Sequence, residues 1–157
     1  MRAEEIMARQ LETCRVVDSL WDAARKMWDH DIGCLPVEAS DGRITSVITD
    51  RDIAMAAYLR GTPLEEIKVE EAMSHRLVTV QPGDSLQLVE ERMRSEQVRR
   101  IPVVDTLGFL KGMITVNDLV HHLRTMRSRE GLDPAEVAGT LAAISAPRPL
   151  PSGSAEA

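Results

Sequence analysis

The 157-residue sequence has few aromatic residues, few cysteines and no long apolar run. One Phe, one Tyr and two Trp make up only 3% of the chain, so a core must be built from aliphatic side chains and methionine. The two cysteines, Cys14 and Cys34, are too few for a disulfide scaffold and favour a reducing compartment. No apolar run approaches the ~18 residues that cross a bilayer, and the acidic start of the chain is not typical of a secretory signal. We therefore expect a cytoplasmic protein that does not bind a membrane.

The charge balance excludes one further class of partner. Nineteen basic and 25 acidic residues give a formal net charge of −6, which argues against a general basic surface for nucleic acid. Neither a Gly-rich phosphate loop nor a nucleophile elbow is found in the sequence. We therefore expect neither a nucleic-acid partner nor an enzyme.

The chain contains an internal repeat with an offset of 66 residues. Without gaps, fifteen of the 50 residues at 4–53 are identical to their counterparts at 70–119, whereas chance would give about three. The identical residues include the Thr and Asp of two Thr-x-x-Asp segments, at 49–52 and 115–118. Two copies of one structural unit are therefore predicted.

Each copy has the pattern β-α-β-β-α. In copy 1 we expect an extended stretch at 11–16, a helix from about 18 to 29, strands at 35–37 and 44–48, and a second helix from 49. A unit of this size is too small to bury a good core alone. The predicted fold class is α/β (α+β), with two tandem repeats packed about a pseudo-twofold axis.

The copies are followed by a different kind of sequence. We divide the chain into copy 1 at 1–65, copy 2 at 66–124 and a C-terminal region at 125–157. Asp133 followed by Pro134 is typical of a helix start, and predicts a short helix that ends near Ile144. The last residues, rich in Pro, Ser, Gly and Ala, predict a disordered tail.

The repeated unit resembles the CBS domain, and the pair resembles a Bateman module. The features that carry the resemblance are the β-α-β-β-α order, the strands Leu35-Pro36-Val37 and Ile101-Pro102-Val103, and the two Thr-x-x-Asp segments. It covers roughly residues 3–124 and is similar to stand-alone actinobacterial CBS-pair proteins of the hypoxic or dormancy response type. The resemblance implies a regulatory module that requires no cofactor and binds AMP, ADP, ATP or S-adenosylmethionine in clefts between the repeats.

The resemblance assigns roles to the Thr-x-x-Asp segments. In the family the acid holds the ribose and the hydroxyl contacts ribose or phosphate, which points to Asp118 with Thr115 and to Asp52 with Thr49. The same spacing is also that of a capping box, in which the two side chains only satisfy amides of the first helical turn. Both interpretations stay open at this point.

Basic residues distinguish the two copies. Family members often place a phosphate-contacting basic residue before the Pro-Val strand, where copy 2 has Arg99 and Arg100 and copy 1 has Gly33 and Cys34. Copy 1 instead carries Arg51 within its Thr-x-x-Asp segment. The residues expected to contact ligand are Thr79, Arg100, Ile101, Pro102, Val103, Thr115 and Asp118 in copy 2, and Thr13, Leu35, Pro36, Val37, Thr49, Arg51 and Asp52 in copy 1.

Comparison of the copies also predicts an interaction surface. Trp21, Trp28, Met55 and Tyr58 on the helices of copy 1 align with polar or charged residues in copy 2. Apolar surface of this kind marks partner sites, so we expect a homodimer through these helices or docking of an unidentified protein target. The alternative is that the C-terminal segment at 134–144 covers this face within the same chain.

Two other functions remain as alternatives. Cys14 and Cys34 are candidates for a redox switch or, with His30, for a metal-responsive site, although three ligands at irregular spacing are weak support. The other alternative is a CBS scaffold whose clefts hold no ligand. We expect neither a catalytic residue nor a metal ion.

Overall fold

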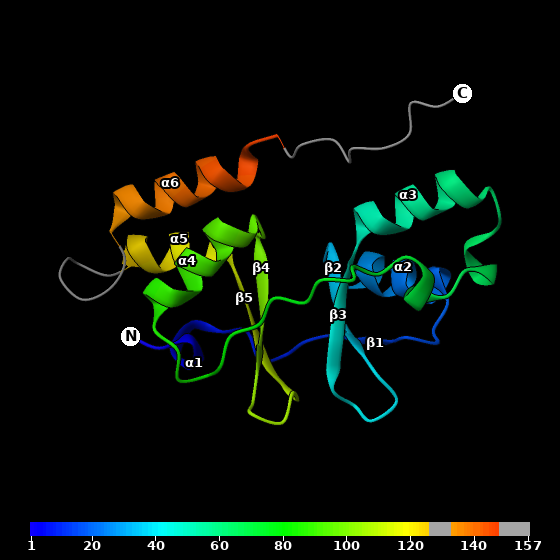
Figure 1. Cartoon of the computed structure of the whole chain (residues 1–157), viewed down its shortest axis with the longest axis horizontal. Helices are drawn as coiled ribbons and strands as arrows, with labels where there is room; N and C mark the ends of the chain where they lie inside the picture. The colour runs from blue at the N-terminus through cyan, green and yellow to red at the C-terminus, as the bar shows by residue number, and fades with distance from the viewer. Residues whose placement is uncertain (126–132, 148–157) are drawn as a thin grey trace.

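The computed structural model describes residues 1–125 and 133–147. Two β-hairpins lie side by side at the centre of the molecule, and helices cover the outer flank of each (Figure 1). Each hairpin with its helices corresponds to one sequence copy, so the predicted α/β fold of two tandem β-α-β-β-α repeats is confirmed.

Repeat 1 is built on a three-stranded sheet of order β1-β2-β3, in which β1 is parallel and β3 antiparallel to β2. Its elements are β1 (Cys14–Arg15), α2 (Leu20–Asp29), β2 (Cys34–Glu38), β3 (Ile44–Thr49) and α3 (Asp50–Arg60), followed by the short 3-10 helices η1 (Leu64–Glu66) and η2 (Val69–Glu71).

Repeat 2 is built on the antiparallel hairpin β4-β5. Its elements are α4 (Leu86–Glu96), β4 (Arg100–Val104), β5 (Leu110–Thr115) and α5 (Val116–Thr125). Where repeat 1 has β1, repeat 2 has a single parallel bridge between Val80 and Val103. The first helix, α1 (Ala3–Ile6), and the last, α6 (Pro134–Ser145), complete the described chain.

Local sequence signals explain the element boundaries. Ser19 and Ser85, at equivalent positions, cap α2 and α4, and each side chain accepts a hydrogen bond from the backbone amide three residues further on. Gly42 and Gly108 have φ angles of 81° and 91° in the hairpin turns, a conformation that favours glycine. The helix starts and the hairpin turns of both repeats therefore follow from local sequence.

The N-terminal segment of the chain packs on repeat 2. The amide of Ala3 donates to the carbonyl of Asp84 at 2.8 Å, and Ala8 forms an antiparallel bridge with Met113. Ala3 and Met7 are buried in the same core as the β4-β5 hairpin. Residues that belong to copy 1 in the sequence therefore complete the core of repeat 2.

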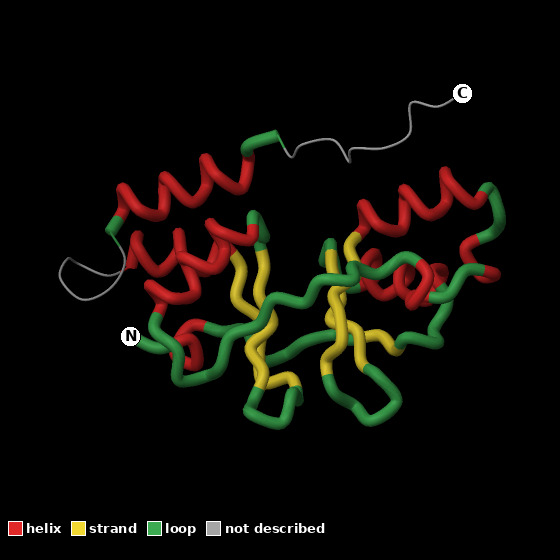
Figure 2. Tube along the Cα trace, viewed as in Figure 1, coloured by secondary structure: helices red, strands yellow, loops and turns green. Residues whose placement is uncertain are grey.

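The equivalent segment of copy 2 packs on repeat 1. The amide of Leu20 donates to the carbonyl oxygen of Ile67 at 2.8 Å, and the amide of Val69 donates to the carbonyl oxygen of Asp18 at 2.9 Å. Ile67 and Val69 are buried in the core of repeat 1. The chain therefore crosses between the halves twice (Figure 2), and the packing runs across the sequence boundary near residue 65.

The two crossings contact their sheets at equivalent positions, one through a side-chain hydrogen bond and the other through close packing on a glycine. In repeat 1 the hydroxyl of Ser46 donates to the carbonyl of Ser74. The equivalent residue in repeat 2 is Gly112, where a Cβ atom would lie 2.5 Å from Met7 Sδ and 2.9 Å from the carbonyl oxygen of Ala8. Glycine at 112 therefore permits the close approach of the N-terminal segment.

The C-terminal helix covers repeat 2 and not the apolar helices of repeat 1. Helix α6 begins after the N-cap Asp133, and so confirms the predicted helix. It packs against α4 and α5, with Val137 and Ile144 in the core of repeat 2. The hypothesis that segment 134–144 covers the copy 1 face is therefore wrong. The tail predicted to be disordered comprises residues 145–157. Ser145 is instead the last residue of α6, and residues 148–157 lie outside the described chain.

We predict that Gly112→Ala lowers the free energy of unfolding by about 1–3 kcal/mol, because the added methyl group meets the packed N-terminal segment. Urea unfolding followed by circular dichroism measures this. Gly83→Ala is the matched control, since a Cβ atom there meets nothing within 4 Å. Equal stability of the two variants would contradict the tight crossing.

Candidate functional site

A cavity of about 1000 Å³ lies between the two repeats. Repeat 1 and the N-terminal crossing contribute Ala8, Gln10, Leu11, Glu12, His30, Asp31, Ile32, Gly33, Cys34 and Pro36. Repeat 2 contributes Arg99, Arg100, Met113, Thr115, Val116 and Asn117, and α6 contributes Leu141, Ile144 and Ser145. The N-terminal crossing thus forms one wall because it must pass between the halves to reach β1.

The start of α5 provides a polar end to this cavity. The backbone amide and the hydroxyl of Thr115 both donate to Asp118 Oδ2 at 2.7 Å, and the amide of Asp118 donates back to Thr115 Oγ1 at 3.3 Å. Thr115 and Asn117 line the cavity. Both bonds that Asp118 accepts from Thr115 end on Oδ2, and Asp118 itself is not among the residues that line the cavity.

The equivalent residues of copy 1 form the same arrangement. Thr49 donates twice to Asp52 Oδ2 at 2.8 Å and caps α3. The capping interpretation is therefore confirmed in both copies. Thr49 and Asp52 are not among the residues that line the cavity, whereas Thr115 is.

Arg100 connects the two repeats at the cavity. It faces Thr115 across the β4-β5 hairpin, and its Nη1 donates to the carbonyl oxygen of Gly33 at 3.4 Å. A Cβ atom on Gly33 would lie 3.1 Å from Asp50 Oδ2 and 3.4 Å from Arg100 Nη2, so glycine leaves room for both charges. The Arg100 guanidinium thus lies beside a carboxylate of the other repeat.

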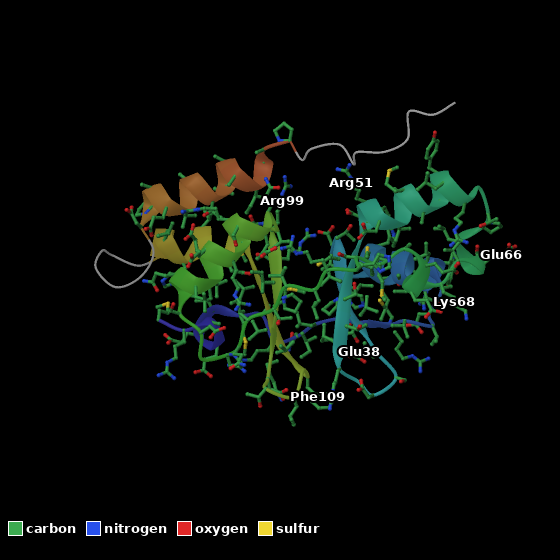
Figure 3. The ribbon with its side chains drawn as sticks, in the orientation of Figure 1. Glu38, Arg51, Glu66, Lys68, Arg99 and Phe109 are labelled. Carbon is green, nitrogen blue, oxygen red and sulfur yellow. The ribbon has the colours of Figure 1, made fainter. Side chains whose placement is uncertain are left out.

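Arg99 lies at the rim of the cavity. It is exposed, and its carbonyl oxygen accepts from the amide of Val116 at 2.9 Å. Figure 3 shows Arg99 and Arg51 at the same edge of the molecule, on opposite sides of the junction between the repeats. Of these two arginines, Arg99 lines the cavity and Arg51 does not.

The remaining predicted ligand residues lie elsewhere. The carbonyl oxygens of Thr13 and Thr79 accept hydrogen bonds from Lys26 and Arg92, which occupy equivalent positions in the two copies. Most of the Pro-Val strand residues are buried in the strand layer: Leu35 and Val37 in the core of repeat 1, and Ile101 and Val103 in that of repeat 2. Pro102 is also buried, and its carbonyl accepts from Val80. Of the strand residues, Pro36 and Arg100 line the cavity.

Two walls of the cavity were missed by sequence reasoning. Residues 8–12 carry only a weak signal, because their role follows from a crossing that no local pattern encodes. The other is α6, whose Leu141, Ile144 and Ser145 line the cavity. Helix α6 has no counterpart in the 66-residue repeat, so comparison of the copies could not place it.

The two cysteines are separate, buried thiols. Cys14 pairs with Val37 across β1 and β2, and Cys34 lies three residues before Val37 on β2. That spacing corresponds to about 10 Å along a strand, too far for a disulfide without backbone movement. Burial raises the pKa of Cys14 to about 12, and burial also raises that of Cys34, although Arg100 opposes the second shift.

The predicted interface residues are exposed. Trp28 and Tyr58 are 86% and 79% exposed, and Trp21 and Met55 are exposed to a lesser degree. The Arg25 guanidinium lies 5.4 Å from the centre of the Trp21 ring and covers part of it. The helices of repeat 1 therefore present aromatic surface to solvent.

This architecture is that of a known family of regulatory modules. The sequence profile of the CBS domain matches residues 3–58 and again 69–125, so the chain belongs to the CBS domain family as a tandem pair. The chain is 31% identical over 121 residues to Hypoxic response protein 1 of Mycobacterium tuberculosis, covering 77% of this chain and 84% of that protein. The predicted resemblance is confirmed.

Solved structures support the same fold. The crystal structure of Hypoxic Response Protein I with two coordinated zinc ions has a TM-score of 0.71 and 30% identity, over 78% of this chain and 98% of that one. The CBS domain pair of protein MJ0100, in complex with 5'-methylthioadenosine and S-adenosyl-L-methionine, has a TM-score of 0.71 at 23% identity, over 79% and 96% of the two chains.

The described residues contain neither a helix suited to a membrane nor a cluster of metal-ligand side chains. Within 1–125 and 133–147, no helix has both the length and the apolar character needed to cross a membrane. In the same part of the chain, no three or more His, Cys, Asp or Glu side chains are grouped as metal ligands would be.

We predict that iodoacetamide at pH 8 labels Cys14 far more slowly in the folded protein than in urea, because a pKa of about 12 leaves little thiolate. Cys34, which lines the cavity, reacts faster than Cys14 but more slowly than a free thiol. Peptide mass spectrometry over a time course measures both rates. Labelling of Cys14 at its unfolded rate would contradict its burial.

Proposed function

We propose that the chain is a regulatory module that binds an adenosine-containing nucleotide, namely AMP, ADP, ATP or S-adenosylmethionine, in the cavity between its repeats. The observation that carries the proposal is the meeting of Thr115, Arg99 and Arg100 in one cavity of about 1000 Å³. This volume is sufficient for a nucleotide.

The cavity offers a partner for each part of such a ligand. The first turn of α5 favours negative charge. Asp118 directly follows the lining residues Thr115, Val116 and Asn117, and its carboxylate is our candidate acceptor for the ribose hydroxyls. Arg99 supplies a cation for phosphate at the rim. Apolar side chains, among them Ile32 and Met113, would pack against the purine, since no Phe, Tyr or Trp is found among the described residues that line the cavity.

The comparisons are consistent with this assignment. The MJ0100 pair shares the fold and holds two adenosine-bearing ligands. The two coordinated zinc ions described above are those of Hypoxic Response Protein I. No grouping of metal ligands among the described residues supports a metal-responsive switch in this chain. A disulfide switch through Cys14 and Cys34 is disfavoured by their separation along the sheet.

The position of the cavity between the repeats explains how a bound ligand would change the packing of the protein. The cavity has walls from both repeats, so an occupant contacts both and favours the relative packing that it fits best. We infer that the role of the protein is regulatory and not catalytic. We also infer that the protein is cytoplasmic.

We predict that a nucleotide at 100 times its dissociation constant stabilises the protein by about 2.7 kcal/mol. A thermal-shift panel with AMP, ADP, ATP and S-adenosylmethionine on the full chain measures this. Asp118→Ala and Asp52→Ala form a matched pair, because both remove the same capping bonds. Each loses about 1 kcal/mol of stability, but only Asp118→Ala loses nucleotide binding.

Three results would contradict this assignment. No shift with any nucleotide would remove the proposed function. Binding retained in Asp118→Ala would reduce Asp118 to a capping residue. Equal loss of binding in both variants would show that the site does not depend on the cavity beside Thr115.

We also propose self-association through the exposed helices of repeat 1. In repeat 2 the residue equivalent to Trp28 is Arg94, which hydrogen-bonds to Thr140 of α6. The equivalent face of repeat 1 has no such cover among the described residues, and it is apolar where repeat 2 is charged. Symmetry mates that pair through α2 and α3 would bury the aromatic rings.

We predict that sedimentation equilibrium gives twice the chain mass for the wild type, and the single chain mass for Trp28→Glu and Tyr58→Glu. Leu107→Glu is the control, because Leu107 is an exposed apolar residue of the repeat 2 hairpin loop. A monomeric wild type would refute the dimer, and dissociation of the Leu107 variant would place the interface elsewhere.

A further inference from the structure

Helix α6 is both a cover for repeat 2 and a wall of the nucleotide cavity. Leu141, Ile144 and Ser145 line the cavity, and Leu141 is 40% exposed. Figure 1 shows α6 lying over α4 and α5, with its C-terminal end directed toward the middle of the molecule. An apolar side chain is thus partly exposed at the wall of a cavity that also has polar lining residues.

A polar cluster holds α6 in this position. Glu90, a buried carboxylate of α4, accepts from Thr140 Oγ1 and from Arg94 Nη2. Arg94 Nε donates to Thr140 Oγ1 at 3.0 Å, and near the end of the helix Gln97 Nε2 donates to the carbonyl of Ala143 at 3.0 Å. These bonds fix α6 against α4 at the level of the cavity.

Repeat 1 lacks the residues that hold such a helix. The positions equivalent to Glu90, Arg94 and Gln97 are Ala24, Trp28 and Asp31, and Trp28 is almost fully exposed. The duplication therefore provides anchors for α6 on one side only.

The position in copy 1 that corresponds to this cavity, around Thr49, differs from the cavity in its charged residues. Where the cavity has Val116, copy 1 has Asp50, whose carboxylate lies beside Gly33 and Arg100. Gln10 and His30 line the cavity, whereas the residues equivalent to them in copy 2, Arg76 and Glu96, form an ion pair. Paired charges there replace groups that a ligand could contact.

We propose that Leu141 and Ile144 of α6 are ligand-contacting residues, and that nucleotide binds only in the cavity beside Thr115, at one nucleotide per chain. Helix α6 adds apolar contacts at that cavity, whereas paired charges occupy the corresponding position of copy 1. This inference rests on the proposed function. An occupant that buries Leu141 gains apolar contact, and by linkage it stabilises the docked position of α6.

The test compares Leu141→Gln with Ala138→Gln on the full chain. Both place the same side chain on α6, but Ala138 is exposed and does not line the cavity. Isothermal titration with the nucleotide that gives the largest thermal shift measures affinity and stoichiometry. We expect roughly tenfold weaker binding for Leu141→Gln, wild-type affinity for Ala138→Gln, and one site per wild-type chain.

A second measurement reports on α6 directly. Hydrogen exchange of residues 134–145 slows when nucleotide is added to the wild type, and Thr140→Val, which removes the bonds to Glu90 and Arg94, both speeds this exchange and weakens binding. A wild type that binds no nucleotide removes the proposed function and this inference together. A wild type that binds normally, with unchanged affinity in Leu141→Gln and unchanged exchange of α6, overturns this inference alone, as does a stoichiometry of two.

Discussion

The reciprocal crossing of the N-terminal segments is the constraint on which the rest of the structure depends. Each repeat is too small to bury a core alone, and each completes its core with residues that precede the other repeat in sequence. Ala3 and Met7 fill repeat 2, and Ile67 and Val69 fill repeat 1. The halves are therefore joined by buried apolar surface as well as by the linker. The same crossing places residues 8–12 in the junction, where they form a wall of the cavity.

Much of this fold could be predicted because its signals are local. The Thr-x-x-Asp spacing gave both capping boxes, and Gly42 and Gly108 marked both hairpin turns. The site was harder to predict. Reasoning within each copy grouped Thr115 with the strand of its own repeat, whereas the cavity combines Thr115 with Pro36 of the other. That combination depends on how two folded units face each other, and no pattern within one unit encodes it.

Divergence between the copies has given two equivalent surfaces different chemistry. The α4 surface carries Glu90 and Arg94, which bind α6. The equivalent α2 surface carries Ala24 and Trp28, and Trp28 remains exposed. A polar surface with specific bonds suits a helix that is always present in the same chain. An aromatic surface suits a partner whose approach has to be driven by burial of apolar area.

The same divergence links the C-terminal helix to regulation. A ligand changes an equilibrium only if it binds the two states unequally. In a symmetric module the two ligand positions would be alike, and occupancy would act on both halves in the same way. Here α6 lines the cavity beside Thr115, so the nucleotide of our proposal would contact repeat 2, the junction and α6 together. The exposed face of α2 and α3 lies on the other repeat. Arg100, Gly33 and Asp50 meet at the junction beside the cavity, and with the two buried crossings they are the contacts that join the cavity to that repeat.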